Sequence, residues 1–361
     1  MYNKTALQYA ISGADTIMKK YTAQNLPPSD RFHYHQGVFL TGIERLYEIT
    51  GEEKYFNYIK DWVDFHISPN GDCSTCHLDE FDDMQPGRLL IGLYDRTGDE
   101  RYKRHLDVII SAAERHPKNA LGGVWHKLRY KNQMWLDCMY MMGVVVTEYA
   151  LRFNEPYLIE VVYRQMELMY ENMRNPETGL LYHAWDHSKT AFWADNQTGC
   201  SPDHWGRAMG WFAVAVAEIA AMLPDADKHK AKVTEIAKEI LKAVAKYQDK
   251  ETGLWYQVLD KKEDLRNWHE TSCSALFVYA MKKAKDSGIT DDLYDENIRI
   301  GYEGVISRTR EENTGLVIDG VCVGTGVGNA PYYFSRPTVS TDLHGMGAFL
   351  LMCTQIHQGR D

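Results

Sequence analysis

Apolar and small residues are concentrated in six segments of the chain, and each segment follows a loop that is richer in polar residues. Helical spacing with so few polar positions is typical of helices buried on most sides, and small residues allow close packing. The pattern therefore predicts six buried helices. Two of them begin at Tyr34 and Asp82, and the others cover 134–146, 205–222, 271–281 and 343–352.

More amphipathic segments lie between these six, as at 228–247, where apolar residues recur at helical spacing among charges. Such helices cover a core with one face and meet water with the other. The alternation of the two kinds predicts an all-α fold, an (α/α)6 barrel of six inner and six outer helices. No stretch is rich enough in Pro, Gly and Ser to serve as a linker, so residues 1–361 are expected to form one domain.

Two short phrases recur along the chain. Leu-Tyr-x-x-Thr-Gly at 46–51 and 93–98 predicts the end of a helix. Thr-Gly followed by apolar residues recurs at 177–183, 251–257 and 313–319, with a weaker relative at 121–126. Equivalent positions of a repeat occupy equivalent places in a fold. We therefore expect one common surface for the polar residues at the shared offset, which are His126, His183, Gln257 and Asp319.

Composition narrows the choice of partners. The net charge is −10, from 40 basic and 50 acidic residues, and no basic stripe is present, which argues against nucleic acid and anionic membranes. No apolar run reaches the roughly 18–20 residues of a membrane-spanning helix. The start lacks a signal-peptide pattern, so we expect a cytoplasmic protein, and its seven cysteines are expected to be reduced. The sequence leaves the oligomeric state open.

Two motifs suggest a cofactor, but their surroundings argue against one. Residues 73–77, Cys-Ser-Thr-Cys-His, match a haem-attachment pattern without an export signal, and one CxxC without a second pair is a poor zinc site. Residues 324–328, Gly-Thr-Gly-Val-Gly, resemble a phosphate loop, but Asn329 replaces the last glycine and no strand is expected before them. We expect neither a metal nor an organic cofactor.

Two carboxylates stand near the starts of apolar segments. Asp137 follows Asn132-Gln-Met-Trp-Leu and is the acidic residue of an otherwise apolar stretch. A buried, unpaired carboxylate costs several kcal/mol, so Asp137 is either a helix cap or a functional acid. Asp82 opens an earlier segment in the same way, although acidic residues are common in the first turn of a helix.

Arg207 lies in the apolar segment His204-Trp-Gly-Arg-Ala-Met-Gly-Trp211. An arginine in such surroundings requires an anionic partner. The partner is either a substrate carboxylate or one of the internal aspartates Asp82, Asp83 and Asp203. Aromatic residues near these positions could offer stacking faces to sugar rings; they are Tyr34, Trp125, Trp185 and Trp205.

A series of motifs, in order from about residue 30 to the end, resembles the unsaturated rhamnogalacturonyl hydrolases of glycoside hydrolase family 105, relatives of the family 88 unsaturated glucuronyl hydrolases. The most specific is Asn132-Gln-Met-Trp-Leu-Asp137. Phe32 departs from an expected Trp, and Gln36 from an expected Asn. The other motifs are Tyr34-His-Gln-Gly37, Asp82-Asp-Met-Gln-Pro-Gly-Arg88, Trp125-His126, His183-Ala-Trp-Asp186, Trp205-Gly-Arg-Ala-Met-Gly-Trp211 and Glu270-Thr-Ser272.

The resemblance implies an (α/α)6 barrel and a cofactor-free enzyme acting on oligosaccharides with a 4,5-unsaturated uronic acid at the non-reducing end. In that reaction the enol ether is hydrated. Asp137 would protonate C4 and then take a proton from the water that attacks C5. Asp82 would hold ring hydroxyls and raise the pKa of Asp137, and Arg207 would bind the uronate. The implied substrate-binding residues are Tyr34, His126, His183, Trp205, Arg207 and Trp211.

Three alternatives use the same residues. An inverting glycosidase would employ Asp137 and Asp82 as acid and base across a water molecule. An epimerase would move a proton at a sugar carbon with His126 and His183. A sugar-binding protein would keep the cleft without turnover. The residues leave open whether the sugar is a galacturonate linked to rhamnose, a glucuronate or a sulfated relative.

Overall fold

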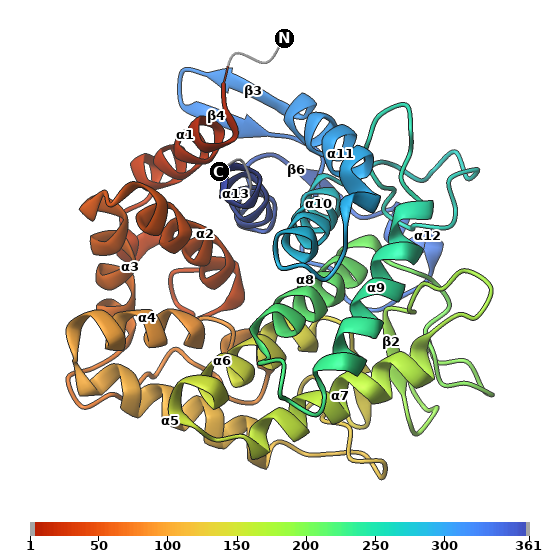
Figure 1. Ribbon diagram of the computed structural model, residues 1–361, viewed down its shortest axis with the longest axis horizontal. Helices are drawn as coiled ribbons and strands as arrows, with labels where there is room; N and C mark the ends of the chain where they lie inside the picture. The colour runs from red at the N-terminus through yellow and green to blue at the C-terminus, as the bar shows by residue number, and fades with distance from the viewer. Residues whose placement is uncertain (1–3, 359–361) are drawn as a thin grey trace.

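Two concentric rings of helices form the computed structural model, which describes residues 4–358 (Figure 1). Within these residues, six inner helices contact one another in sequence order around the centre, and six outer helices each pack against an inner neighbour. The inner helices are α2 (Tyr34–Thr50), α4 (Gly87–Thr97), α6 (Val144–Phe153), α8 (Gly206–Met222), α10 (Thr271–Asp286) and α13 (Leu343–Gln358). The outer helices are α1 (Ala6–Lys20), α3 (Glu53–His66), α5 (Glu100–Arg115), α7 (Tyr157–Met173), α9 (Lys230–Lys246) and α11 (Asp295–Ser307).

This arrangement confirms the predicted (α/α)6 barrel. The repeated Thr-Gly phrases end α2 and α4 as expected, because Gly51 and Gly98 both adopt a left-handed φ of 67°. In that conformation the glycine N–H bonds the carbonyl four residues back and stops the helix. The acidic residue two positions later then starts the outer helix of the pair. The chain thus reverses direction at the same end of the barrel in each hairpin.

The segment 134–146 differs from the continuous helix that its apolar pattern predicted. Its first residues form strand β1 (Gln133–Trp135), which pairs antiparallel with β2 (Ala184–Asp186). A π-helical turn, Met139–Gly143, then leads into α6. Asn132 has a φ of 62°, so the chain turns sharply just before β1, and the partner strand lies some fifty residues further on in the chain. An apolar strand this short cannot be separated from a buried helix by periodicity alone.

Other short elements cover the barrel at the N-terminal ends of the inner helices. A 3-10 turn, Phe81–Asp83, precedes α4. β3 (Thr309–Glu312) pairs with β4 (Gly315–Ile318), and β5 (Val321–Cys322) pairs with β6 (Thr338–Val339). β5 therefore precedes the glycine-rich residues 324–328, where no strand was expected, but the helix that follows, α12 (Ala330–Phe334), is only five residues long. The remaining 3-10 turns are Ala23–Asn25 and Asp292–Tyr294.

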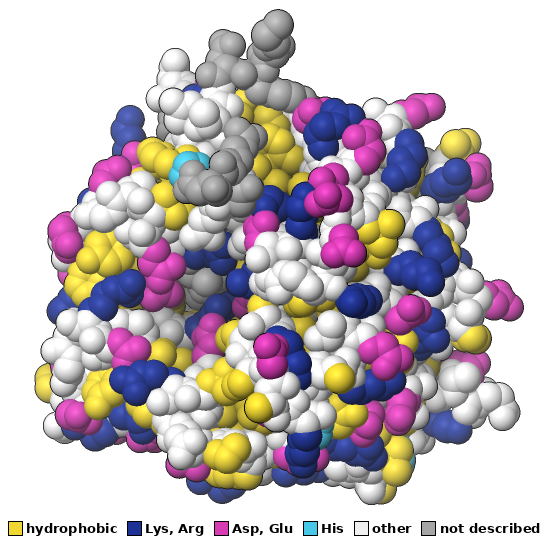
Figure 2. All heavy atoms as spheres, in the orientation of Figure 1, with side chains coloured by type: hydrophobic (Ala, Val, Ile, Leu, Met, Phe, Trp, Pro, Cys, Tyr) yellow, Lys and Arg dark blue, Asp and Glu magenta, His cyan; other side chains and the backbone are white. Residues whose placement is uncertain are grey.

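The two ends of the barrel differ. Loops and short strands gather where the inner helices begin. At the other end, a cavity of about 720 Å³ opens among charged side chains from the last turns of α2, α4 and α6, including Arg45, Arg96 and Arg152. Figure 2 shows this face with a hollow among Lys, Arg, Asp and Glu side chains. Among the described residues, no helix is both long and apolar enough to cross a membrane.

Candidate active site

Asp137 and His183 are brought together by the β1–β2 pair. Asp137 lies two residues after β1, and His183 immediately precedes β2. The Leu136 N–H donates to the His183 carbonyl (3.1 Å), which continues the pairing as far as these two side chains. His183 Nε2 lies 3.3 Å from Asp137 Oδ2, close enough for an ion pair but not aligned for a hydrogen bond. Both atoms are buried, and neither has a hydrogen-bond partner.

The pKa of Asp137 does not follow the expectation of a raised value. Burial raises it, but the nearby His183, followed by His126, outweighs burial and lowers the pKa below the ordinary value of an aspartate. The charge on Asp82 acts in the expected upward direction, but it is the weakest of these influences. Sequence reasoning included the neighbouring carboxylate and missed the stronger effect of the adjacent His183 imidazole.

Asp82 lies in the 3-10 turn before α4 and is held by Lys127, which contacts its Oδ2. His126 Nε2 is 3.9 Å from the other carboxylate oxygen. Burial alone would raise the pKa of Asp82, but Lys127, His126 and His33 lower it well below its usual range. Burial also lowers the pKa of His126 to about 4, against the opposing effect of Asp82. Near neutral pH, Asp82 is therefore ionised and His126 is uncharged.

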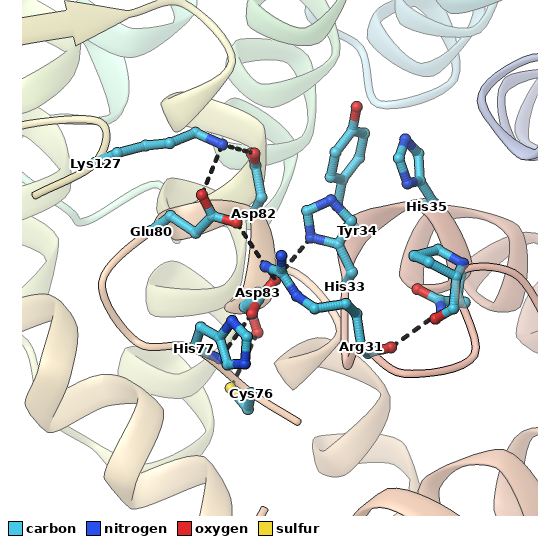
Figure 3. A network of polar contacts seen from close by, with 12 residues as sticks. Arg31, His33, Tyr34, His35, Cys76, His77, Glu80, Asp82, Asp83 and Lys127 are labelled. Atoms are coloured by element: carbon cyan, nitrogen blue, oxygen red, sulfur yellow. Dashed lines mark hydrogen bonds and ion pairs between the residues drawn. The ribbon is translucent and has the colours of Figure 1, made fainter. Parts of the chain in front are cut away.

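A buried charge network links Lys127 to Glu80, Asp83 and Arg31 (Figure 3). Lys127 also contacts Glu80 (2.9 Å), and Arg31 Nη2 bridges Glu80 and Asp83 at 2.5 Å each. His33 Nδ1 adds a 2.6 Å contact to Asp83. Among the described residues, the side chains of His33, Glu80 and Asp83 form one group compact enough to hold a metal ion. Arg31, Lys127 and Arg129 together balance the charges of Glu80, Asp82 and Asp83, so this group does not need a metal for charge balance.

Tyr34 begins α2 and points toward α13. Its hydroxyl lies 2.6 Å from His344 Nε2, while His344 Nδ1 contacts Asp342. The Tyr34 ring meets the edge of Trp211 at 6.5 Å between centroids. Burial, followed by the charge of Asp82, raises the pKa of Tyr34 well above its ordinary value, so the hydroxyl keeps its proton. Tyr34 can therefore act as a hydrogen-bond donor or acceptor in the mouth of the barrel.

Arg207 is only 1% exposed and donates to two backbone carbonyls, those of Cys322 (2.6 Å) and Val323 (2.8 Å). Its guanidinium also stacks over the Trp205 ring at 4.8 Å. None of the aspartates considered as internal partners pairs with it within residues 4–358. Asp82, Asp83 and Asp203 are paired instead with Lys127, Arg31 and Lys261 respectively. Arg207 thus fastens β5 to α8, an arrangement that the sequence did not reveal.

Most of the predicted aromatic residues are buried against other side chains and do not present open faces for stacking. Trp205 is buried between His183 (4.7 Å between centroids) and Tyr333 (5.9 Å, nearly parallel). Trp211 stacks on Tyr140 at 4.9 Å. Trp185 is buried with its Nε1 donating to the Thr198 carbonyl, and Trp125 is half-buried. Trp135 stacks on His126 at 4.6 Å and meets the edge of His183 at 5.4 Å. Trp135 therefore packs between the two histidine side chains.

The repeat offsets place three of their four polar residues around this centre. His126 and His183 flank Trp135, and buried Gln257 donates to the Tyr333 carbonyl (3.2 Å). Asp319 differs: it contacts Arg310 and Ser340 at the edge of the barrel. All seven cysteines in the described residues are free.

Sequence reasoning missed two residues of the site, Lys127 and Tyr333. Lys127 follows the expected His126 directly, so a lysine beside a site histidine was an available signal. No sequence signal pointed to Tyr333. Its hydroxyl lies 2.8 Å from His183 Nδ1, but the two residues are 150 positions apart in the chain. Asp137, His183, His126, Asp82 and Tyr34 together make a buried, polar mouth that can exchange protons and hydrogen-bond a sugar. Arg207 lines its wall.

Comparison with known proteins gives consistent matches. Residues 10–359 match the family model described as Glycosyl Hydrolase Family 88. An unsaturated rhamnogalacturonyl hydrolase, YesR, from Bacillus subtilis strain 168 is 25% identical over 337 residues, which are 89% of this chain and 88% of the relative.

Solved structures agree with the family match. A glycoside hydrolase from family 105 of C. acetobutylicum ATCC 824 has a TM-score of 0.92 and 33% identity, covering 97% of this chain and 99% of its own. The unsaturated glucuronyl hydrolase of Bacillus sp. GL1 shares the fold, with a TM-score of 0.73 at 14% identity over 98% of this chain and 97% of its own.

Proposed function

The chain belongs to glycosyl hydrolase family 88, and from this membership we propose that it releases the 4,5-unsaturated uronic acid from the non-reducing end of oligosaccharides left by polysaccharide lyases. It is a glycoside hydrolase. The observation that supports the proposed activity most directly is the pair of buried atoms Asp137 Oδ2 and His183 Nε2, which face each other at 3.3 Å without a hydrogen-bond partner. Buried polar atoms are normally satisfied, so such a pair is ready for a ligand.

The proposed reaction is hydration of the enol ether. Asp137 transfers a proton to C4, which leaves positive charge at C5. Asp137, now a carboxylate, takes a proton from a water molecule while the water oxygen bonds C5. The resulting hemiketal collapses and the remaining sugar is released. Asp82, ionised beside Lys127, accepts hydrogen bonds from ring hydroxyls.

The lowered pKa of Asp137 in the free protein has to be reconciled with its role as an acid. The unsaturated uronide carries its own carboxylate. Bringing that charge into a buried mouth and excluding water both disfavour the Asp137 anion, so the pKa of Asp137 rises when substrate binds. His183 faces Asp137 at 3.3 Å and is placed to supply the proton. We infer that Asp137 becomes protonated only when the substrate is bound.

The proposed substrate class is narrower than the family. The name of the Bacillus subtilis relative points to rhamnogalacturonan fragments. We therefore propose an unsaturated galacturonate linked to rhamnose as the preferred substrate. Tyr34, Arg207, Trp205 and Trp211 are proposed to shape the uronate pocket, with Arg207 holding β5 against it and contributing positive charge near the carboxylate.

The test uses lyase-generated unsaturated disaccharides of the galacturonate and glucuronate types. Turnover should remove the ultraviolet absorbance of the enol ether, and turnover in heavy water should place deuterium on C4 of the released product. The matching saturated uronide should be inert. Cleavage of the saturated sugar, or a product without deuterium at C4, would overturn hydration in favour of a conventional inverting glycosidase.

A matched pair of variants tests whether Asp137 is the general acid. Asp137→Asn should lower kcat by about 10²–10⁴, the usual contribution of general acid–base catalysis, while substrate still binds. Asp225→Asn, at a fully exposed turn after α8, should leave kcat unchanged. An Asp137→Asn enzyme that kept a tenth of the wild-type kcat would exclude Asp137 as the acid. Exhaustive chelation should leave activity unchanged.

We also propose that the whole chain acts as a single domain in the cytoplasm. One cooperative unfolding transition would support the first part, and fractionation of cells would test the second. Two separate unfolding transitions, or recovery outside the cytoplasm, would contradict the respective part.

A further inference from the structure

Three aromatic side chains surround a second, smaller cavity of about 390 Å³ near the proposed active site. They are Phe192, Trp193 and Tyr332, and Val327 and Asn329 complete its wall. Phe192 is 92% exposed, although apolar rings of this size are normally buried because water contact is costly. We call Phe192, Trp193 and Tyr332 the aromatic pocket.

The aromatic pocket adjoins the proposed catalytic centre without being part of it. Val327 and Trp193 pack with Trp135 in one small apolar cluster, and Trp135 in turn stacks on His126. On the other side, the Gly328 N–H donates to the Tyr333 hydroxyl (3.0 Å), which contacts His183. One layer of side chains therefore separates the pocket from Asp137 and His183.

The loop that carries Phe192 and Trp193 is fixed at both ends. On one side, Asp186 accepts backbone hydrogen bonds from Ser188, Thr190 and Ala191 at 2.7–2.9 Å. On the other, Asp195 accepts from the N–H groups of Gln197 and Thr198. The exposed ring thus stands on an anchored loop. A preorganised aromatic surface loses little conformational freedom when it binds a ligand.

We propose that the aromatic pocket binds the leaving part of the oligosaccharide, at the second or a later sugar counted from the scissile bond. The assignment rests on the proposed function. The C–H face of a pyranose ring is apolar and packs against aromatic faces, while the Asn329 amide at the rim can bond ring hydroxyls. The position beyond the first sugar follows from Trp135 and Val327, which lie between the pocket and the catalytic pair.

The experiment compares an unsaturated disaccharide with an unsaturated tetrasaccharide from lyase digestion of rhamnogalacturonan. For Phe192→Ala, we expect kcat/KM on the tetrasaccharide to fall about tenfold, the scale of one lost aromatic contact. The disaccharide cannot reach the pocket, so its kcat/KM should change less than twofold. The matched control is Leu265→Ala, which removes another fully exposed apolar side chain from a different loop and should affect neither substrate.

Two results would overturn the proposal. Equal losses on both substrates would mean that Phe192 supports the active site itself. No loss on either, with a change in oligomeric state measured by light scattering, would assign Phe192 to a protein interface.

Binding without turnover separates this proposal from the proposed function. Calorimetry with a saturated rhamnogalacturonan tetrasaccharide should show weaker binding to Phe192→Ala than to wild type, even if the protein turns over no unsaturated uronide. Equal affinities would reject the aromatic pocket as a saccharide site.

Discussion

The Tyr333 hydroxyl lies 2.8 Å from His183 Nδ1 and accepts a hydrogen bond from the Gly328 N–H. Because the hydroxyl oxygen is already an acceptor, its own proton is free to be donated to Nδ1. The contact orients the His183 ring so that its other nitrogen, Nε2, faces Asp137. Tyr333 thereby positions His183 beside the proposed acid.

Tyr333→Phe should lower kcat about tenfold, since one hydrogen bond is worth about 1–1.5 kcal/mol. The acidic and alkaline limits of the pH–rate profile should also shift, because the His183 ring would no longer be held in its position beside Asp137. Steady-state kinetics across pH measures both effects. Tyr94→Phe, at the opposite end of the barrel, is the control. A lower kcat with an unchanged pH profile would reduce Tyr333 to a packing role.

Arg207→Met should destabilise the fold as well as weaken substrate binding. Two backbone carbonyls, of Cys322 and Val323, would lose a charged donor inside the protein. Hydrogen bonds to charged groups contribute about 1.5–3 kcal/mol each, so the free energy of unfolding should fall by about 3 kcal/mol. Urea unfolding measures this loss.

Affinity then separates the two roles of Arg207. Binding of the unsaturated uronide, compared with a neutral unsaturated analogue, reports the charge contribution. If both ligands lose affinity equally, Arg207 acts only by holding β5. If stability is unchanged, the contacts to the two carbonyls contribute nothing.

Arg31→Met should lower the free energy of unfolding more than the loss of a surface arginine does. It would leave the carboxylates of Glu80 and Asp83 buried with less positive charge, and breaking a buried ion pair typically costs 3–5 kcal/mol. The control is Arg299→Met, whose pairs with Glu296 and Glu303 are exposed and should be worth less than about 1 kcal/mol. Chemical denaturation compares the two variants. Similar losses would show that Lys127 and Arg129 already neutralise the cluster.

Stability should fall on mild acidification. Burial lowers the pKa of both His126 and His116 to about 4 in the folded protein, whereas an unfolded histidine titrates near 6.5. Between these values the unfolded chain binds more protons than the folded one, so stability present above pH 6.5 is lost as pH falls toward 4. Each histidine contributes at most about 3 kcal/mol to this loss.

Urea unfolding at pH 7 and pH 5 tests this dependence, with His116→Gln as the comparison because His116 lies outside the proposed site. Its pH dependence should be shallower than that of wild type. Equal stability of the wild-type protein at both pH values would contradict the buried, neutral state of the two histidines.

The inner helices could be predicted from sequence because a buried helix needs apolar residues on most faces, which leaves a dense local pattern. α8 and α10 therefore begin within one residue of expectation. The prediction for the segment after Asn132 was wrong because the structure of this segment depends on a partner strand that is distant in sequence. Local periodicity contains no information about that partner.

The candidate site divides in the same way. Asp82, Asp137, His126 and His183 could be proposed from motifs and repeat offsets, because each stands near the start of an apolar segment or at the shared offset after a glycine. What they contact could not be found. The partners that decide the pKa of Asp137 and the contacts of Arg207 come from elements far apart in the chain, and only folding shows which side chains meet.

The β1–β2 pair also limits how sequences with this barrel can diverge. Met134 lies opposite Trp185, and a shift of one residue in this register would turn every side chain of the strand to its other face. It would also move His183 by about 3.3 Å along the strand, out of reach of Asp137. Insertions and deletions should therefore be rare within these two strands and in the residues directly beside them. They should be common at turns such as Asn154, where α6 ends on the opposite face.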